Sequence, residues 1–281
     1  MSKKRSEYFI KVKEIALREG ILTEIFFNFY EEMFLYHERY QNIYNKSISL
    51  NHFLTWNETP ALNTDLIKFS SKDMEYLHTA IEDLLDIIQR HTGTRHAGQR
   101  EKIFSEKDFF DHSLRSLLKR DCDSLREISS GLVMEPDKLI FILVNLYRPL
   151  VKNMREGARD NLAYREREKH LCPFCGFYPD MSAIMESGSG GMIIHCALCE
   201  HEWEFGRLRC AVCGNSNHEK LGFLISRHTG MRVDFCDQCG GYIKTLLVPP
   251  SSGIGMYDLT IENLLTRDLD CSAMESGYSR P

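Results

Sequence analysis

The spacing of hydrophobic residues over the first 165 positions is typical of α-helices. Apolar side chains recur every three or four residues, which places them on one face of a helix. Polar and glycine-containing stretches interrupt this pattern, and we expect irregular chain over 45–69 and 91–98. The pattern predicts helices over 6–18, 22–40, 70–89, 105–118, 121–130 and 136–149.

Local sequence signals support several of these helices. Ser70-x-x-Asp73 has the form of a capping box, in which two side chains satisfy the first backbone N–H groups. Pro136 suits the first position of a helix. The stretch 139–146 is apolar nearly all round, so we expect it at the centre of a helical bundle. Pro149 should then kink or end that helix.

Beyond residue 165 the pattern changes to short β-hairpins. Residues 151–170 contain six Lys or Arg and four Asp or Glu, which is typical of a solvated helix or linker. A last amphipathic helix is expected over 257–274. The hairpins pair 181–186 with 192–195 and 221–226 with 231–235, around turns at 187–191 and 228–230.

Eight of the ten cysteines lie in this hairpin region, in four Cys-x-x-Cys pairs. Two such pairs complete a tetrahedral four-thiolate site, and gaps of 20 and 22 residues between pairs suit a hairpin. Because each hairpin joins two pairs, consecutive pairs should share a metal; interleaved pairing would require the modules to cross. We therefore predict one site from Cys172, Cys175, Cys196 and Cys199, and another from Cys210, Cys213, Cys236 and Cys239.

The two halves of the region also repeat each other. Cys-Pro-Phe-Cys-Gly at 172–176 aligns with Cys-Ala-Val-Cys-Gly at 210–214, and the later pairs align with an offset of 40 residues. This pattern indicates a tandem duplication. A glycine follows the second cysteine at Gly176, Gly214 and Gly240. We expect positive φ there, because it turns backbone N–H groups towards the thiolates.

Other uses of the cysteines fit less well. Disulfides are rare in a reducing compartment, and no βαβ pattern of a thioredoxin-like protein surrounds any pair. A purely structural role for the metals remains open, since it is the commonest role of a closed four-thiolate site. Cys122 is expected to be a buried thiol, and Cys271 is outside any ligand spacing. Four histidines could each replace a cysteine, but we favour surface or supporting roles for His195, His201, His218 and His228.

Charge, hydropathy and the absence of known catalytic motifs exclude several classes of function. The net charge is −5, no run of 18 apolar residues occurs, and the start has no export signal, so we expect a cytoplasmic protein without membrane insertion. Residues 172–247 carry six basic and eight acidic side chains, which disfavours nucleic acid as a partner. Neither a glycine-rich phosphate loop nor His-Glu-x-x-His occurs. We therefore expect a binding protein and not an enzyme.

The chain resembles the FdhE-type formate dehydrogenase accessory proteins, most specifically from about 168 to 280. The shared motifs are Cys-Pro-x-Cys-Gly at 172–176, His-Cys-x-x-Cys at 195–199 with Trp203 beyond, Cys-x-x-Cys-Gly-Asn at 210–215 and Cys-x-x-Cys-Gly-x-Tyr at 236–242. The resemblance implies a cytoplasmic maturation factor for the catalytic subunit of a respiratory formate dehydrogenase. It also implies rubredoxin-like sites with iron as the metal.

The expected architecture is α+β. It comprises a helical bundle over 1–165, a first rubredoxin-like or zinc-ribbon module over 166–208, and a second over 209–281 that includes the C-terminal helix. Iron and zinc both accept four thiolates, so the two metal ions could be either. An electron-transfer protein that uses iron is the alternative function, and a zinc-ribbon nucleic-acid binder is the third.

Overall fold

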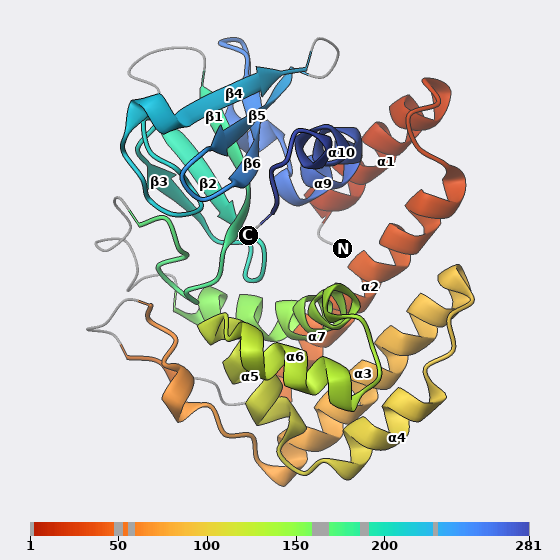
Figure 1. The fold of residues 1–281 in the computed structure, drawn as a ribbon. Helices are drawn as coiled ribbons and strands as arrows, with labels where there is room; N and C mark the ends of the chain where they lie inside the picture. The colour runs from red at the N-terminus through yellow and green to blue at the C-terminus, as the bar shows by residue number, and fades with distance from the viewer. Residues whose placement is uncertain are drawn as a thin grey trace. The chain divides into compact units, whose positions relative to one another are not determined.

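The computed structural model describes residues 3–47, 53–55, 60–158, 169–185, 191–226 and 230–280 (Figure 1). Turn residues 187–190 and 228–229 and linker residues 159–168 lie outside this part. The chain forms two compact units. The first comprises Leu22–Arg159 with Met1–Ser2 and Cys175–Phe177, and the second comprises Lys3–Ile21, Asp160–Phe174 and Tyr178–Pro281.

The first unit is helical. α7 packs against α2, α3, α5 and α6, which confirms the central place predicted for the apolar segment. It continues through Pro149, which does not end it, because the neighbouring Leu146, Leu150 and Val151 are fully buried and hold the turn in place. The helices are α2 (Glu24–Ser47), α3 (Ser71–Thr92), α4 (Ala97–Ser105), α5 (Phe109–Lys119), α6 (Cys122–Gly131) and α7 (Pro136–Gly157), with the short 3₁₀ turn η2 (Thr64–Leu66).

The helix ends follow their sequence signals in most places. Ser70 and Asp73 form the predicted capping box at the start of α3. α4 was not predicted, since its only buried side chain is that of Ile103 and the amphipathic signal is weak. The prediction of a buried thiol at Cys122 is wrong. Cys122 is the first residue of α6 and is exposed, because the buried face of the helix, with Leu125, Ile128 and Ser129, begins one turn later.

The second unit contains a six-stranded mixed sheet. The predicted hairpins are β1–β2 and β4–β5, and each gains a third strand, β3 or β6. The order is β3-β2-β1-β6-β5-β4, and the parallel pair β1–β6 joins the two halves into one sheet. The strands are β1 (Pro179–Met185), β2 (Met192–Cys196), β3 (Glu202–Phe205), β4 (Leu221–Ile225), β5 (Met231–Cys236) and β6 (Gly241–Val248).

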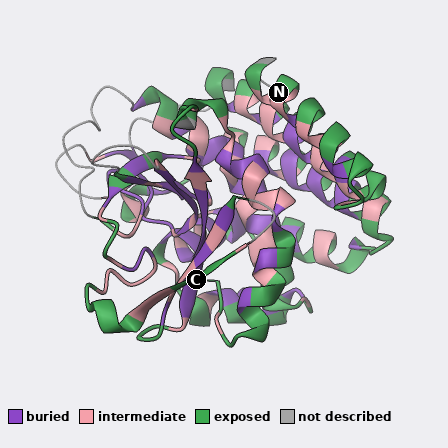
Figure 2. Ribbon diagram, turned by 90° about the horizontal axis from the view of Figure 1, so that it is seen from above, coloured by how far each residue is buried: buried purple, intermediate pink, exposed green. Residues whose placement is uncertain are grey.

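Helices at the end of the chain cover part of this sheet. The predicted single helix is two, α9 (Leu259–Leu265) and α10 (Arg267–Glu275), separated at Thr266. They bury Leu259, Leu269 and Ala273 against apolar side chains of β1, β5 and β6. Figure 2 shows the resulting buried positions along the strands. Two 3₁₀ turns, η3 (His218–Lys220) and η4 (Ile254–Met256), complete the unit. The α+β class with helical and four-cysteine parts is thereby confirmed.

The first helix, α1 (Lys3–Arg18), is grouped with the sheet unit, although the predicted bundle range 1–165 included it. Ion pairs and a hydrogen bond join α1 to residues of the sheet unit. Arg5 binds Glu200 at 2.9 Å and Asp258 at 2.6 Å, and the hydroxyl of Tyr8 donates to Glu262. The independent folding of the predicted domains stays a prediction. In the described part of the chain, no helix is long and apolar enough to cross a membrane.

Candidate metal centres

The first cluster of cysteines consists of Cys172, Cys175, Cys196 and Cys199. Their Sγ atoms all lie within 4.8 Å of one another, and all four residues are buried. Cys172 and Cys175 lie in a turn that precedes β1, while Cys196 ends β2 and Cys199 closes the turn that follows. The hairpin thus brings the two pairs together, as the consecutive pairing predicted.

The second cluster consists of Cys210, Cys213, Cys236 and Cys239, and it repeats this arrangement. Its Sγ atoms also lie within 4.8 Å of one another. Cys236 ends β5, as Cys196 ends β2. The burial differs, however, because Cys239 is exposed and Cys213 is half-buried. The second cluster is therefore open to solvent on one side, and the first is not.

The sulfur distances fit a tetrahedral metal site. A metal bonded to four thiolates at about 2.3 Å places the sulfur atoms about 3.8 Å apart. The Sγ atoms of Cys172 and Cys199 are 3.5 Å apart, and those of Cys210 and Cys239 are 3.8 Å apart. Both distances are far longer than the roughly 2.05 Å of a disulfide bond. Each cluster could therefore bind one metal ion.

In each cluster, backbone N–H groups point at the leading sulfur of one Cys-x-x-Cys turn. In the first cluster, the N–H groups of Leu198 and Cys199 donate to Cys196 Sγ at 3.4 and 3.5 Å. In the second, those of Val212 and Cys213 donate to Cys210 Sγ at 3.3 and 3.4 Å. Such bonds stabilise a thiolate over a thiol. The donor set thus suits a cation.

The turns require positive φ after the second cysteine. Gly176, Gly214 and Gly240 adopt φ values of 75°, 76° and 67°, as predicted. The fourth equivalent position is Glu200, which adopts φ 54° without being glycine. Its carboxylate receives two hydrogen bonds from Arg5, at 3.1 and 2.9 Å. This ion pair connects the strained turn of the first cluster to helix α1.

Cys236, in the second cluster, is a thiol whose pKa is lowered. Burial raises its pKa, but hydrogen bonds from backbone N–H groups and from the Asn215 amide outweigh burial and lower the pKa to about 7. The Asn215 Nδ2 atom lies 3.6 Å from the sulfur. Burial dominates at Cys239, where the pKa is raised to about 11. A cation at the cluster centre would favour the thiolate at both positions.

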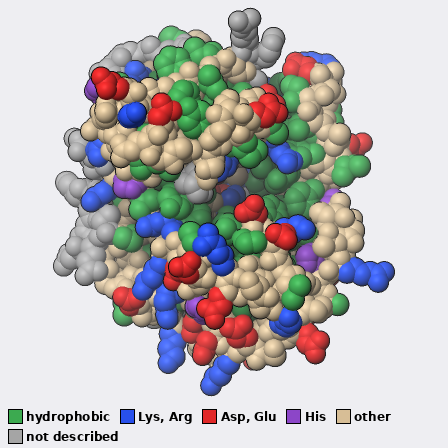
Figure 3. Space-filling view, in the orientation of Figure 1, with side chains coloured by type: hydrophobic (Ala, Val, Ile, Leu, Met, Phe, Trp, Pro, Cys, Tyr) green, Lys and Arg blue, Asp and Glu red, His purple; other side chains and the backbone are tan. Residues whose placement is uncertain are grey.

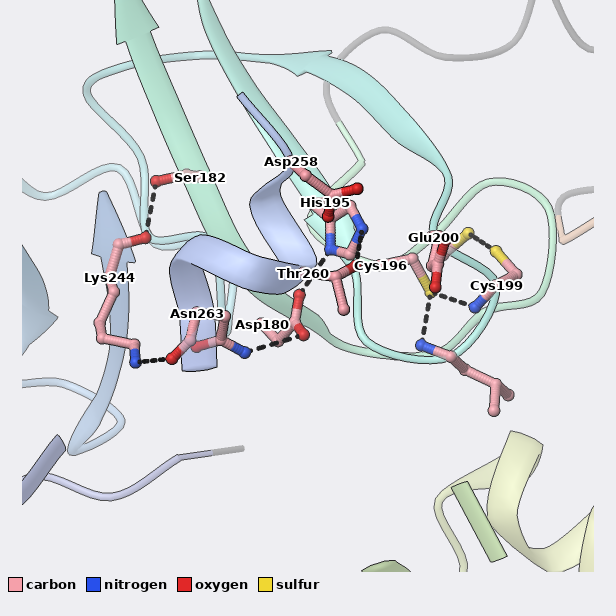
Figure 4. A network of polar contacts seen from close by, with 12 residues as sticks. Asp180, Ser182, His195, Cys196, Cys199, Glu200, Lys244, Asp258, Thr260 and Asn263 are labelled. Carbon is pink, nitrogen blue, oxygen red and sulfur yellow. Dashed lines mark hydrogen bonds and ion pairs between the residues drawn. The ribbon is translucent and has the colours of Figure 1, made fainter. Parts of the chain in front are cut away.

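His195 and His201 lie outside both clusters. His195 is buried, its Nδ1 atom is 2.7 Å from Asp180 Oδ1, and its Nε2 atom is 3.4 Å from Thr260 Oγ1 (Figure 4). Burial alone would lower the pKa of His195, but the charge and hydrogen bond of Asp180 outweigh it and raise the pKa. His201 is also buried and stacks on Trp203, so of the two roles expected, surface or supporting, the surface role is excluded for both histidines.

His218 is exposed and His228 lies outside the described residues. The remaining two cysteines, Cys122 and Cys271, are exposed and belong to neither cluster.

A buried polar network behind the first cluster was not predicted. Asp180 also accepts a hydrogen bond from Asn263 Nδ2 at 3.1 Å, and the Nζ atom of Lys244 donates to the Asn263 carbonyl at 2.7 Å (Figure 4). Lys244 is fully buried in β6. A lysine within the apolar strand Gly241–Val248 is the one sequence signal that could have revealed this network.

Comparisons with known proteins agree with the geometry. Residues 171–207, which hold the first cluster, match the family described as FdhE, central domain. An FdhE homologue from Edwardsiella ictaluri is 32% identical over 147 residues, which is 51% of this chain and 46% of that protein. One from Aquifex aeolicus is 29% identical over 217 residues, 75% of this chain and 70% of that protein. The chain spans less than half the length of several FdhE homologues that it matches, including those from Edwardsiella ictaluri and Shewanella sp..

A solved structure shows the same fold. The crystal structure of the FdhE protein from Pseudomonas aeruginosa superimposes with a TM-score of 0.52 at 18% identity. The alignment covers 86% of this chain and 83% of that one. Fold and sequence therefore confirm the resemblance noted from the cysteine motifs.

Proposed function

We propose that this chain, which is of the FdhE type in sequence and fold, is an accessory protein for the maturation of a formate dehydrogenase. In this proposal it binds the catalytic subunit of a respiratory formate dehydrogenase in the cytoplasm and is needed for active enzyme. It catalyses no reaction of its own. The cytoplasm is proposed because thiols that bind metals stay reduced there.

The observation that carries the proposal is the position of the cysteines. All eight cysteines of the family motif are present, and the structure gathers them into two clusters within or next to the matched segment. A closed four-thiolate site has no open position for a substrate. The metal would therefore hold the turns and shape a docking surface.

The eight cysteines would hold two metal ions. Four thiolates accept iron or zinc, and the resemblance to FdhE-type proteins favours iron. The bound ion would supply a covalent cross-link between two turns and, if it is iron, a one-electron redox couple. The chain's own contribution is the N–H donors and the buried packing that fix the sulfur atoms.

A capture experiment tests the proposal. The affinity-tagged chain is purified from cells in which formate dehydrogenase is induced, and the co-purified proteins are identified by mass spectrometry. Formate dehydrogenase activity is measured in parallel in a strain that lacks the gene. We expect the catalytic subunit in the eluate and little activity in the deletion strain. Full activity in the deletion strain, with no formate dehydrogenase subunit captured, would contradict the proposal.

Matched serine variants connect the function to the clusters. Cys172→Ser removes a buried ligand of the first cluster, and Cys271→Ser makes the same change at an exposed cysteine outside both clusters. We expect Cys271→Ser to restore activity to the deletion strain and Cys172→Ser to fail, with a loss of about one metal ion per chain. Equal activity of both variants would show that the first cluster is not needed for the function.

An electron-transfer role is the alternative, and the exposure of Cys239 favours it. A ligand at the surface lets a partner approach the metal closely, which electron exchange needs. The iron-loaded protein would then change colour reversibly on reduction, and zinc-loaded protein would not support the function. If the zinc-loaded protein restored formate dehydrogenase activity, the electron-transfer role would be rejected and the docking role would remain.

A further inference from the structure

The strand β4 (Leu221–Ile225) is the last strand at one edge of the sheet. It pairs with β5 on one side, and within the described residues no strand pairs with its other side. An edge strand presents backbone N–H and C=O groups in the geometry that a further strand requires.

The hydrogen-bond register between β4 and β5 shows which backbone groups of β4 point away from the sheet. The Ser226 N–H donates to the Met231 carbonyl, and the Asp237 N–H donates to the Lys220 carbonyl, so even-numbered residues of this strand face β5. Backbone groups alternate in direction along a strand of an antiparallel pair. The backbone groups of Phe223 and Ile225 therefore point away from the sheet.

The side chains of this strand are apolar and exposed. Phe223, Leu224 and Ile225 are 54%, 43% and 61% exposed. Leu224 lies opposite Val233 on one face of the sheet, while Phe223 and Ile225 lie opposite Asp234 and Arg232 on the other. Figure 3 shows hydrophobic side chains at the surface in the region where Figure 1 places β4.

Proteins normally protect such an edge. Lysine, proline, a bulge or an inward-pointing charge disfavours pairing with another chain. The strand Leu-Gly-Phe-Leu-Ile has none of these, and its pairing with β5 is regular over all five residues. The charged side chains opposite Phe223 and Ile225 are Asp234 and Arg232, which pair with each other, and the Arg232 guanidinium lies 5.0 Å from the Phe223 ring centre. The edge is left apolar and nearly neutral.

We propose that the outer edge of β4 binds an extended, apolar segment of the client protein, which adds to the sheet as a seventh strand. The segment would pair with the backbone groups of Phe223 and Ile225, and its alternate side chains would cover the exposed apolar side chains on both faces. This inference rests on the proposed function, because the client is the protein that the chain is proposed to bind.

A second copy of this chain is the other occupant to consider. Five paired residues extend about 17 Å, and two copies joined along that length bury on the order of 500 Å² in total. A stable specific interface needs about 1,000 Å² or more. Pairing of two edges alone therefore falls short of a stable dimer, whereas a client strand would be one part of a larger docking contact.

Amide hydrogen exchange tests the pairing directly. In the free protein, the amides of Phe223 and Ile225 should exchange quickly, while those of Gly222 and Leu224 are protected by β5. After addition of the purified catalytic subunit of formate dehydrogenase, the amides of Phe223 and Ile225 should slow as well. Unchanged exchange at these two amides, with the subunit bound, would overturn the proposal and leave the proposed function intact.

Variants at one position separate the backbone from the side chain. Phe223→Ala and Phe223→Pro both remove the ring, but only proline removes the outward N–H, which proline tolerates on an edge strand. We expect Phe223→Pro to weaken binding of the catalytic subunit by a further 2- to 12-fold, roughly, relative to Phe223→Ala. Leu208→Ala, at a 66% exposed leucine outside β4, should bind as the unaltered chain does.

The remaining outcomes are also decisive. Equal binding by Phe223→Ala, Phe223→Pro and the unaltered chain would overturn the edge contact. Slow exchange at Phe223 and Ile225 in the free protein, together with a dimeric mass in solution, would assign the edge to a second copy instead. Failure of the unaltered chain to bind the subunit would reject the proposed function itself. Metal content and circular dichroism of each variant show that the fold is retained.

Discussion

The buried ammonium group of Lys244 provides a quantitative test of the sheet unit. Its Nζ atom donates to the carbonyls of Asn263 at 2.7 Å and Thr266 at 3.1 Å, and lies 2.9 Å from Asp270 Oδ2. Asp270 is also bound by Arg280 at 2.6 Å. Lys244 therefore holds α9 and α10 against β6, and its charge is favourable at the C-terminal end of α9.

This environment changes the proton affinity of the amine. Burial, together with the charge of Arg280, outweighs the attraction of Asp270 and lowers the pKa of Lys244 from 10.5 to about 8. Between these values the unfolded chain binds more protons than the folded protein, so stability rises as the pH rises. Below pH 8 the amine is charged in both states, and the folded protein bears the full free-energy cost of burying that charge. It amounts to about 3 kcal/mol, since a tenfold change in proton affinity corresponds to about 1.4 kcal/mol.

Lys244→Met should remove this pH dependence. The variant leaves the carbonyls of Asn263 and Thr266 without their donor, which costs about 1–3 kcal/mol each. Methionine carries no charge, so the variant avoids the cost of burying the ammonium group, which offsets about 3 kcal/mol of that loss at pH 7. Asp270 keeps Arg280 and is not left unpaired. We therefore expect the variant to be less stable by about 1 kcal/mol at pH 7 and by about 4 kcal/mol near pH 10.5.

Urea unfolding at fixed free metal concentration measures the difference. The chain has two tryptophans, so Trp56→Phe leaves the buried Trp203 of β3 as the reporter of the sheet unit. Other titrating groups are common to both proteins and cancel. Lys220→Met, at an exposed lysine, is the control and should differ by less than about 0.5 kcal/mol at every pH. A Lys244→Met difference that stays constant or shrinks as the pH rises would refute the reasoning.

Metal removal and one helix cap give the other predictions. A limiting amount of chelator should empty the second cluster first, because Cys239 is exposed while the first cluster is buried; equal alkylation of both clusters, mapped by mass spectrometry, would contradict this. Complete chelation should spare most of the helical circular dichroism, because the core around α7 contains no metal ligand; global loss of that signal would count against a separate bundle. Ser70→Ala should lower the unfolding free energy of the helical unit by about 1 kcal/mol, whereas Ser71→Ala, one residue later, should change it little; urea denaturation measures both.

The cysteine clusters were the most predictable part of the molecule. Four Cys-x-x-Cys pairs at hairpin spacing determine which sulfurs can meet, because a hairpin brings its two ends together whatever the rest of the chain does. The capping box at Ser70 and the central position of α7 were predictable for a similar reason, since both depend on residues within one helix.

Features that depend on distant partners could not be predicted. α1 has an ordinary helical pattern, and nothing in it indicates that Arg5 meets Glu200 and Asp258 some 200 residues or more later. The network around Lys244 needs the break between α9 and α10, because the carbonyl of Thr266 at that break is one of its acceptors. Periodicity reports burial of a face, but it does not report which polar groups are buried with it.

The parallel pairing of β1 with β6 couples the stability of the two duplicated metal sites. Two modules that each carried their own sheet would lose their metals independently. Here Met181 lies beside Lys244 and Met185 beside Val248, so the hairpin of the first cluster and that of the second share a continuous ladder. Met181, Val233 and Leu246 also belong to one apolar core. Loss of the exposed second site should therefore loosen the strand that supports the buried first site, and the buried site stabilises the sheet on which the exposed one depends.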